Sequence, residues 1–264
     1  MPNYFIAPAL LFILLTTSCT SNPVSLSQSE KSEIERFTFL PEETPGLIYN
    51  GYVYSLKESS SEPNYRYQRT VLGKGYKDIF SHITYSLDGE VVLAQIAETD
   101  QDYKLRHFKS IDRLSGINAT MRYIHDNKLE FAVHKGELTK ITHENPSLPL
   151  VAGPTLFGFI LKNWDDLKSG LTIPFAFVLI ERGETMRFEA KYGESNNEFD
   201  TIIIQTKNPF IRLLVAPMKI VFAKDTRQPI RYIGRVPVML QKNDSLTAFD
   251  ARVEYHYPSS QAYR

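Results

Sequence analysis

The stretch "AFDARVEYHY", residues 248–257, decides the fold class of this chain. Every second position is apolar, and polar or charged side chains occupy the positions between. The apolar set is Phe249, Ala251, Val253, Tyr255 and Tyr257, and the polar set is Asp250, Arg252, Glu254 and His256. Successive side chains of a strand point to opposite faces of the sheet, so this pattern predicts a strand with one dry and one wet face. The segment "MRFEAKY" (186–192) repeats the alternation.

The first half of the chain predicts a run of strands joined by short turns. The expected strands are 47–56, 65–73, 78–87, 90–98, 103–111, 118–126, 128–135 and 137–143. Turn-forming sequences separate several of them, namely "LDGE" (87–90), "HDNK" (125–128) and "HKGE" (134–137). Consecutive hairpins of this kind predict an antiparallel meander.

Two segments predict helices that cover the dry face of the sheet. In 154–168, Pro154 suits a helix start and Gly170 follows the end. Its apolar residues recur at helical spacing and form one stripe: Leu156, Phe157, Ile160, Leu161, Trp164 and Leu167. In 208–216, Asn208 can cap the helix and Pro209 fits its first turn.

Strands that are apolar on both faces complete the expected fold. "LTIPFAFVLI" (171–180) and "TIIIQ" (201–205) have to be covered on both sides or line a cavity. We therefore expect a mainly β (α+β) domain over 37–258, with 259–264 as a C-terminal tail. A large curved antiparallel sheet of about ten strands, an unclosed or nearly closed barrel, would wrap around one or two short helices.

The N-terminal stretch has the features of a bacterial lipoprotein signal. Residues 1–29 have no charged side chain, and the 11-residue apolar block from Phe5 to Leu15 is too short to span a bilayer. The only cysteine of the chain, Cys19, follows it and resembles the lipidated residue of a lipobox. We expect residues 1–18 to be a signal peptide, Cys19 to carry acyl chains, and 19–36 to be a flexible tether. By resemblance to enterobacterial lipoproteins, Thr20 after the cysteine implies the periplasmic face of the outer membrane.

The composition argues against nucleic acid as a partner. Lys plus Arg and Asp plus Glu both number 30 among 264 residues, so the formal net charge is zero. A nucleic-acid-binding protein would show a basic surplus or stripe. We expect the membrane, reached through the lipid anchor, to be one partner.

Motifs for catalysis are missing from the sequence. It has neither a G-x-S-x-G elbow nor a phosphate-binding G-x-x-x-x-G-K loop. His125, His134 and His143 could approach one another on neighbouring strands, although half-exposed strand histidines are the commoner case. Asp165 and Asp166 are adjacent on a helix and diverge. We expect no enzyme activity, no metal and no cofactor, and an enzyme of unrecognised type is the outlying alternative.

Residues 153–257 resemble a group of uncharacterised exported proteins of Gram-negative bacteria. The resemblance rests on "FILKNWDDLKSGLTIPFAFVLIERGETMRFEA", "KNPFIRLLVAPMKIVFAKDTRQPIRYIGRV" and the closing "ARVEYHY". More distantly, the plan of a curled sheet around apolar helices is similar to that of the periplasmic lipoprotein carrier and its outer-membrane receptor. Those proteins hold acyl chains in the concave side of a half-barrel, which implies the same class of ligand here.

The aromatic helical stripe has two readings. It can be plain core, or it can line an apolar pocket made of Phe157, Ile160, Trp164, Phe175, Phe177 and Phe210. The pocket predicts an envelope lipoprotein that holds or passes an acyl chain or another apolar ligand in the periplasm. The alternative is a structural or assembly lipoprotein that binds another envelope protein through a sheet edge or its polar face.

Overall fold

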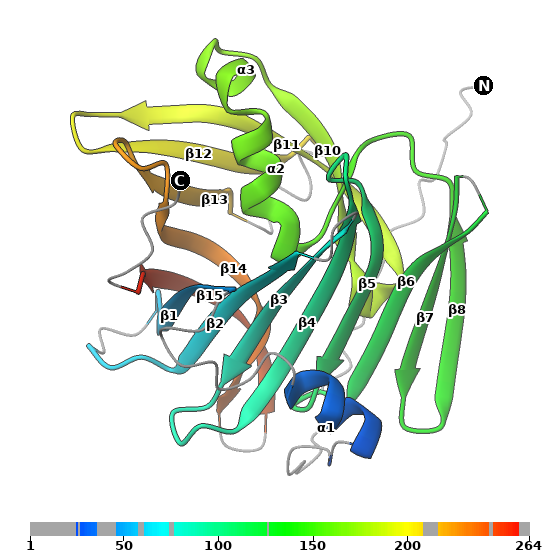
Figure 1. Ribbon diagram of the computed structural model, residues 1–264. Coiled ribbons are helices and arrows are strands. Elements are labelled where there is room, and N and C mark those ends of the chain that lie inside the picture. The colour runs from blue at the N-terminus through cyan, green and yellow to red at the C-terminus, as the bar shows by residue number, and fades with distance from the viewer. Residues whose placement is uncertain are drawn as a thin grey trace, which may run out of the picture.

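A single large sheet dominates the computed structural model (Figure 1). The structure describes residues 25, 27–35, 46–57, 61–73, 77–125, 127–207, 216–242 and 245–258. Its fifteen strands follow the order β8-β7-β6-β5-β4-β3-β2-β1-β15-β14-β13-β12-β11-β10-β9. Neighbours are antiparallel except the parallel pair β9–β10. The predicted mainly β fold with an unclosed curved sheet is confirmed, although the strands outnumber the ten expected.

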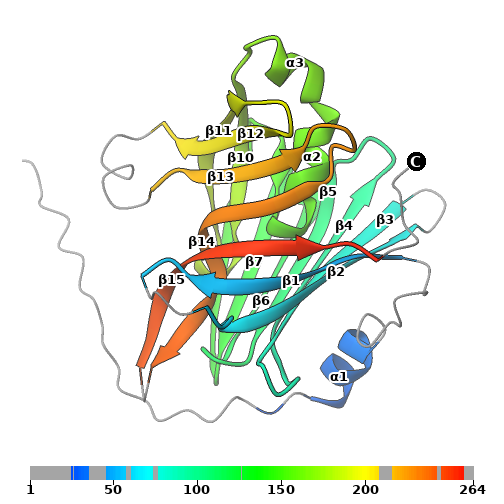
Figure 2. The ribbon, with the colours of Figure 1, turned by 90° about the vertical axis from the view of Figure 1, so that its left-hand side faces the viewer.

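The strands divide into two arms that meet at β1 and β15. The first arm comprises β1 (Leu47–Ser55), β2 (Tyr65–Gly73), β3 (Lys77–Tyr85), β4 (Val91–Asp100), β5 (Leu105–Asp112), β6 (Ile117–His125), β7 (Lys128–Lys135) and β8 (Leu138–Glu144). The second comprises β9 (Leu150–Val151), β10 (Ile173–Leu179), β11 (Glu184–Ser195), β12 (Phe199–Thr206), β13 (Met218–Ala223), β14 (Pro229–Lys242) and β15 (Ser245–His256). Figure 2 shows β14, β15, β1 and β2 side by side at the junction of the arms.

The sheet curls until its β9–β10 edge lies over the concave face of the first arm. Ala176 and Val178 of β10 pack against residues of β5 to β7, such as Phe108, Met121 and Phe131. The alternate residues Phe175 and Phe177 point the other way. Strand β10 is therefore covered on both faces, which explains why its sequence is apolar throughout.

The predicted helix 154–168 lies in the concavity as three short pieces. They are η1 (Gly153–Thr155, a 3₁₀ turn), α2 (Leu156–Lys162) and α3 (Trp164–Lys168), with α2 between the two arms of the sheet (Figure 1). The break falls at Asn163, whose Nδ2 donates to the carbonyl of Phe159 at 2.7 Å. A side chain that binds the backbone of its own helix in this way competes with regular helical hydrogen bonding. The second predicted helix, 208–216, lies outside the described residues except for its last position.

An unexpected helix, α1 (Gln28–Glu35), covers the convex face of the first arm. Ser27 begins it with a capping box, because the Glu30 amide donates to Ser27 Oγ and Ser27 N donates to the Glu30 carboxylate. Ile34 is only 3% exposed and packs with Ile83 and Ile96. Asn118 Nδ2 also donates to Glu30 Oε1 at 2.6 Å. The prediction of a flexible tether over 19–36 is therefore wrong for 28–35, which dock on the sheet.

No helix among the described residues combines the length and the apolar character that crossing a membrane requires.

Candidate functional site

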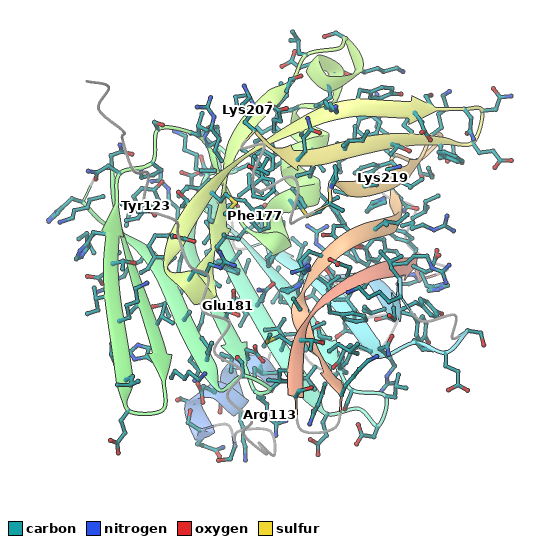
Figure 3. All side chains as sticks on the ribbon, turned by 180° about the vertical axis from the view of Figure 1, so that it is seen from behind. Arg113, Tyr123, Phe177, Glu181, Lys207 and Lys219 are labelled. Atoms are coloured by element: carbon teal, nitrogen blue, oxygen red, sulfur yellow. The ribbon has the colours of Figure 1, made fainter. Side chains whose placement is uncertain are left out.

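The residues of the predicted apolar pocket converge between α2 and the sheet. Phe157 and Ile160 of α2, Trp164 of α3 and Phe175 of β10 are buried in one cluster. The partly buried Phe177, labelled in Figure 3, packs against it. The remaining predicted pocket residue, Phe210, and the predicted lipidation site Cys19 lie outside the described residues. These contacts are expected both if the helical stripe is plain core and if it lines a pocket.

The cluster has an aromatic group on each side of α2. On one side, Phe157 and Trp164 both meet Phe222 of β13, with ring centroids 6.2 and 5.1 Å apart. On the other, Phe175 meets Phe159 at 5.1 Å and stacks on Phe188 at 6.1 Å. Each such pair adds to the area it buries, by about 0.5–1.5 kcal/mol.

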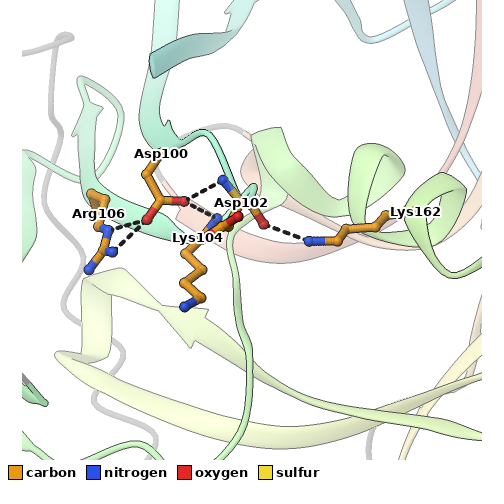
Figure 4. Close-up of polar contacts among 5 residues, drawn as sticks. All are labelled: Asp100, Asp102, Lys104, Arg106 and Lys162. Atoms are coloured by element: carbon orange, nitrogen blue, oxygen red, sulfur yellow. Dashed lines mark hydrogen bonds and ion pairs between the residues drawn. The ribbon is translucent and has the colours of Figure 1, made fainter. Parts of the chain in front are cut away.

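Contacts from the first arm hold α2 in place at both of its ends. At its C-terminal end, Lys162 Nζ donates to the carbonyl of Asp102 at 2.6 Å (Figure 4). The turn that presents this carbonyl is itself held by Asp100, whose carboxylate accepts from the amides of Asp102 and Lys104 and from Arg106.

At the N-terminal end of α2, Tyr103 packs against Gly158 and donates to the carbonyl of Thr155 at 3.2 Å. A Cβ at position 158 would lie 1.7 Å from the Tyr103 hydroxyl oxygen. Only glycine permits this close approach of the helix to the tyrosine, so Gly158 fixes the position of α2 over the sheet.

A row of polar side chains crosses the concave face under η1 and α2. The register places Arg69 of β2 opposite His82 of β3, His82 opposite Gln95 of β4, and Gln95 opposite Ser110 of β5. Tyr49 of β1 pairs with Arg69 at the near end. At the far end, Ser110 Oγ donates to Glu181 Oε1 at 3.1 Å. Glu181, labelled in Figure 3, belongs to the 3₁₀ turn η2 (Ile180–Arg182). We call Arg69, His82, Gln95 and Ser110 the polar row.

The polar row was missed by the sequence reasoning because each member stands alone in its strand. A signal existed for Arg69 alone, which shares one face of its strand with Tyr65, Tyr67 and Val71 in the period-two pattern. The four residues lie side by side only because of the register of β2 to β5, and that register cannot be predicted from the sequence alone.

A buried cation sets the electrostatics at one end of the row. Arg69 is buried, donates to the carbonyl of Pro154 at 3.1 Å, and lies 5.6–5.7 Å from the ring centres of Tyr49, Phe80 and Phe157. Desolvation, reinforced by the charge of Arg69, holds the pKa of His82 well below its ordinary value. His82 is therefore neutral at physiological pH.

Acidic groups mark the opposite end. Burial raises the pKa of Glu181, and the nearby carboxylate of Asp112 raises it further. Burial also raises the pKa of Asp112, against the lowering effect of hydrogen bonds from Ser115 and Leu114. The row thus has a fixed positive charge at the β2 end and carboxyl groups at the η2 end.

Three buried polar atoms on the concave face have no hydrogen-bond partner within the described part of the chain. They are His82 Nε2, Gln95 Oε1 and Thr99 Oγ1, on the adjacent strands β3 and β4. Leaving such a group unsatisfied costs about 1–3 kcal/mol. His82 and Gln95 are paired across β3 and β4, whereas Thr99 lies four residues further along β4. Native proteins keep few unsatisfied groups, and two on paired residues are a place for a bound molecule or water to complete them.

At the β8 edge of the sheet, side chains of the first arm contact the second arm, and among the described strands β8 pairs only with β7. Lys140 Nζ of β8 donates to the carbonyl of Arg182 at 3.0 Å, and Thr142 Oγ1 donates to the carbonyl of Gly183. The Glu144 carboxylate accepts from the amide of Thr185 at 3.0 and 3.1 Å and from its hydroxyl at 2.7 Å. We call these contacts between β8 and the η2–β11 region the seam. The seam lies beside the apolar contacts that β10 makes with β5 to β7.

The histidines considered as metal ligands do not gather. His134 Nδ1 lies 2.9 Å from Thr139 Oγ1, His143 Nε2 lies 3.5 Å from Glu130 Oε2, and His125 is exposed. Within the described ranges, no group of three His, Cys, Asp or Glu side chains could hold a metal ion. Asp165 and Asp166 are both exposed, as their divergence on the helix predicts.

Comparison with known proteins adds a structural likeness. No family model matches the chain, and no curated protein matches it. One solved structure that matches is the crystal structure of a beta-barrel-like protein of a domain of unknown function, DUF1849, from Brucella abortus. It is 8% identical with a TM-score of 0.39, and the match covers 81% of this chain and 98% of that one. The fold described above rests on the strand pairing alone.

Proposed function

We propose that the protein is a binding module of the cell envelope that takes up an acyl chain or another apolar ligand between α2 and the concave face of the sheet. The carrying observation is that Phe157, Ile160, Trp164, Phe175 and Phe177 lie together around a helix that belongs to neither arm. Displacing this helix would break the contacts of Lys162 and Tyr103 but none of the hydrogen bonds between strands. The predicted acylation of Cys19 would place the module on the periplasmic face of the outer membrane.

The unclosed sheet supports this proposal. The sheet ends at β8 and β9, and among the described residues side chains of β8, not strand pairing, join it to the opposite arm. Side-chain contacts break at lower cost than a strand ladder, because fewer hydrogen bonds are lost. A ligand can therefore enter through the seam while both arms keep their strand pairing.

Native mass spectrometry of detergent-free protein, followed by titration with dansyl-labelled undecanoic acid, tests the proposal. We expect one ligand per chain and a dissociation constant that rises about fivefold or more in Phe157→Ala, because a wall of the site is lost. Phe131→Ala is the matched control, since Phe131 is also buried but lies in the separate cluster under β10. Absence of binding to the wild-type protein would refute the proposal.

A second function is favoured by the edge strand β8. Leu138 and Ile141 are 76% and 57% exposed there, and among the described strands none pairs with its outer side. An extended segment of another envelope protein could add to such an edge. A photo-crosslinking residue at Ile141 should then trap one reproducible partner in cells, and the same residue at the exposed Leu87 should not. Equal or absent adducts at the two positions would exclude this function.

A further inference from the structure

The polar row offers hydrogen bonds that an apolar chain alone cannot use. Gln95 is only 4% exposed, and its Oε1 faces the concavity beside His82 Nε2, both without a partner in the described chain. Gly153 of η1 lies directly above, where an added Cβ would be 3.3 Å from Gln95 Oε1. These atoms therefore lie at the η1 end of the apolar cluster, between the sheet and the backbone that leads into α2.

The charges at the two ends of the polar row determine which charge a bound ligand group should have. Arg69 provides a cation one strand away from His82, and the acidic Glu181 lies beyond Ser110 at the other end. Adjacent strands lie about 4.8 Å apart, so Arg69 and Ser110 are separated by roughly 14 Å. A single negative charge is thus favoured at the Arg69 end and disfavoured at the Glu181 end.

We infer that the ligand is an acyl carboxylate, with its carboxylate between Arg69, His82 and Gln95 and its chain running along α2 towards Trp164. This inference rests on the proposed function. His82 donates through Nε2–H, and the Gln95 amide donates once it turns its nitrogen inward, a choice that the ends of an amide allow. One buried guanidinium matches one carboxylate in charge and geometry.

The test compares hexadecanoate with methyl hexadecanoate, which has the same chain and no charge. We expect the wild-type protein to bind hexadecanoate at least about tenfold more tightly, the size of one charge-assisted hydrogen bond. Equal affinities would overturn the inference and leave the proposed function intact, whereas binding of neither ligand would refute the proposed function itself. This comparison needs no variant.

Variants then test whether the polar row causes the preference for hexadecanoate over its methyl ester. Gln95→Leu and His82→Leu should reduce the preference for hexadecanoate about tenfold while the affinity for the ester is unchanged or higher. Gln68→Leu is the matched control, because Gln68 lies on β2 beside Arg69 but on the opposite face. If the preference survives in both site variants, or is lost equally in Gln68→Leu, the carboxylate does not lie on the polar row.

Discussion

Replacing His82 with glutamine should remove a pH dependence from the stability of the protein. The pKa of folded His82 is held well below 6.5, whereas the unfolded chain has the ordinary value of 6.5. The folded state therefore binds fewer protons than the unfolded state below that pH. Above pH 6.5, His82 is neutral in both states and leaves the free energy of unfolding unchanged. As the pH falls below 6.5, the unfolded state gains a proton that the folded state does not, so the free energy of unfolding decreases progressively.

The magnitude follows from the unfolded pKa alone, as long as folded His82 stays neutral to pH 5.5. The loss is RT ln(1 + 10^(6.5 − pH)), which is about 0.06 kcal/mol at pH 7.5 and about 1.4 kcal/mol at pH 5.5. Wild-type protein should thus lose about 1.4 kcal/mol more than His82→Gln over this interval. Asp112 and Glu181, whose raised pKa values act in the opposite direction, are common to both proteins and cancel in the difference.

Urea denaturation followed by Trp164 fluorescence measures this difference, since Trp164 is the only tryptophan and is 2% exposed. Free energies of unfolding are compared at pH 7.5, 6.5 and 5.5. His125→Gln serves as the control, because it makes the same substitution at an exposed histidine and keeps the polar row intact. If the curves of wild type and His82→Gln run parallel, His82 reaches water or is charged in the folded state, and the account of a desolvated polar row is refuted.

Three further substitutions test the supports of the site. Gly158→Ala should displace α2, because its Cβ would meet the Tyr103 hydroxyl oxygen at 1.7 Å, and hydrogen exchange of the α2 amides should rise while the sheet stays protected; unchanged exchange would contradict the role of Gly158. Ile34→Ala should lower the free energy of unfolding by about 2–5 kcal/mol if α1 docks on the convex face, and by less than about 0.5 kcal/mol in urea titrations if α1 is detached. Glu144→Gln should weaken the seam and speed ligand uptake in stopped-flow fluorescence, with Glu137→Gln, on the exposed turn before β8, as control; equal rates would exclude the seam as the route.

The fold class and most of the first arm could be predicted from local patterns. Strands 65–73 and 128–135 match β2 and β7 residue for residue, because alternation and turn residues are local signals. The apolar character of both faces of 171–180 predicted a strand covered on both sides. In the structure, the two faces of β10 belong to two separate apolar clusters. The N-terminal helix was missed, although Ser27 and Glu30 form a capping box, because its apolar face is reduced to Ile34.

The candidate site was predictable only in its apolar part. The helical spacing of Phe157, Ile160 and Trp164 revealed one face of a helix, and such spacing depends on neighbouring residues alone. The polar row depends on the register of β2 to β5, and the register is a property of strand pairs far apart in sequence.

The orientation of a bound acyl carboxylate tests the central claim most directly. The helix α2, roughly 10 Å long, separates Pro154, beside Arg69, from Trp164 at the other end of the site. Octadecanoic acids with a nitroxide label either near the carboxylate or near the methyl end should therefore quench Trp164 differently. The account predicts stronger quenching by the methyl-end label. Equal quenching by both labels, or binding that leaves the fluorescence of Trp164 unchanged, would contradict it.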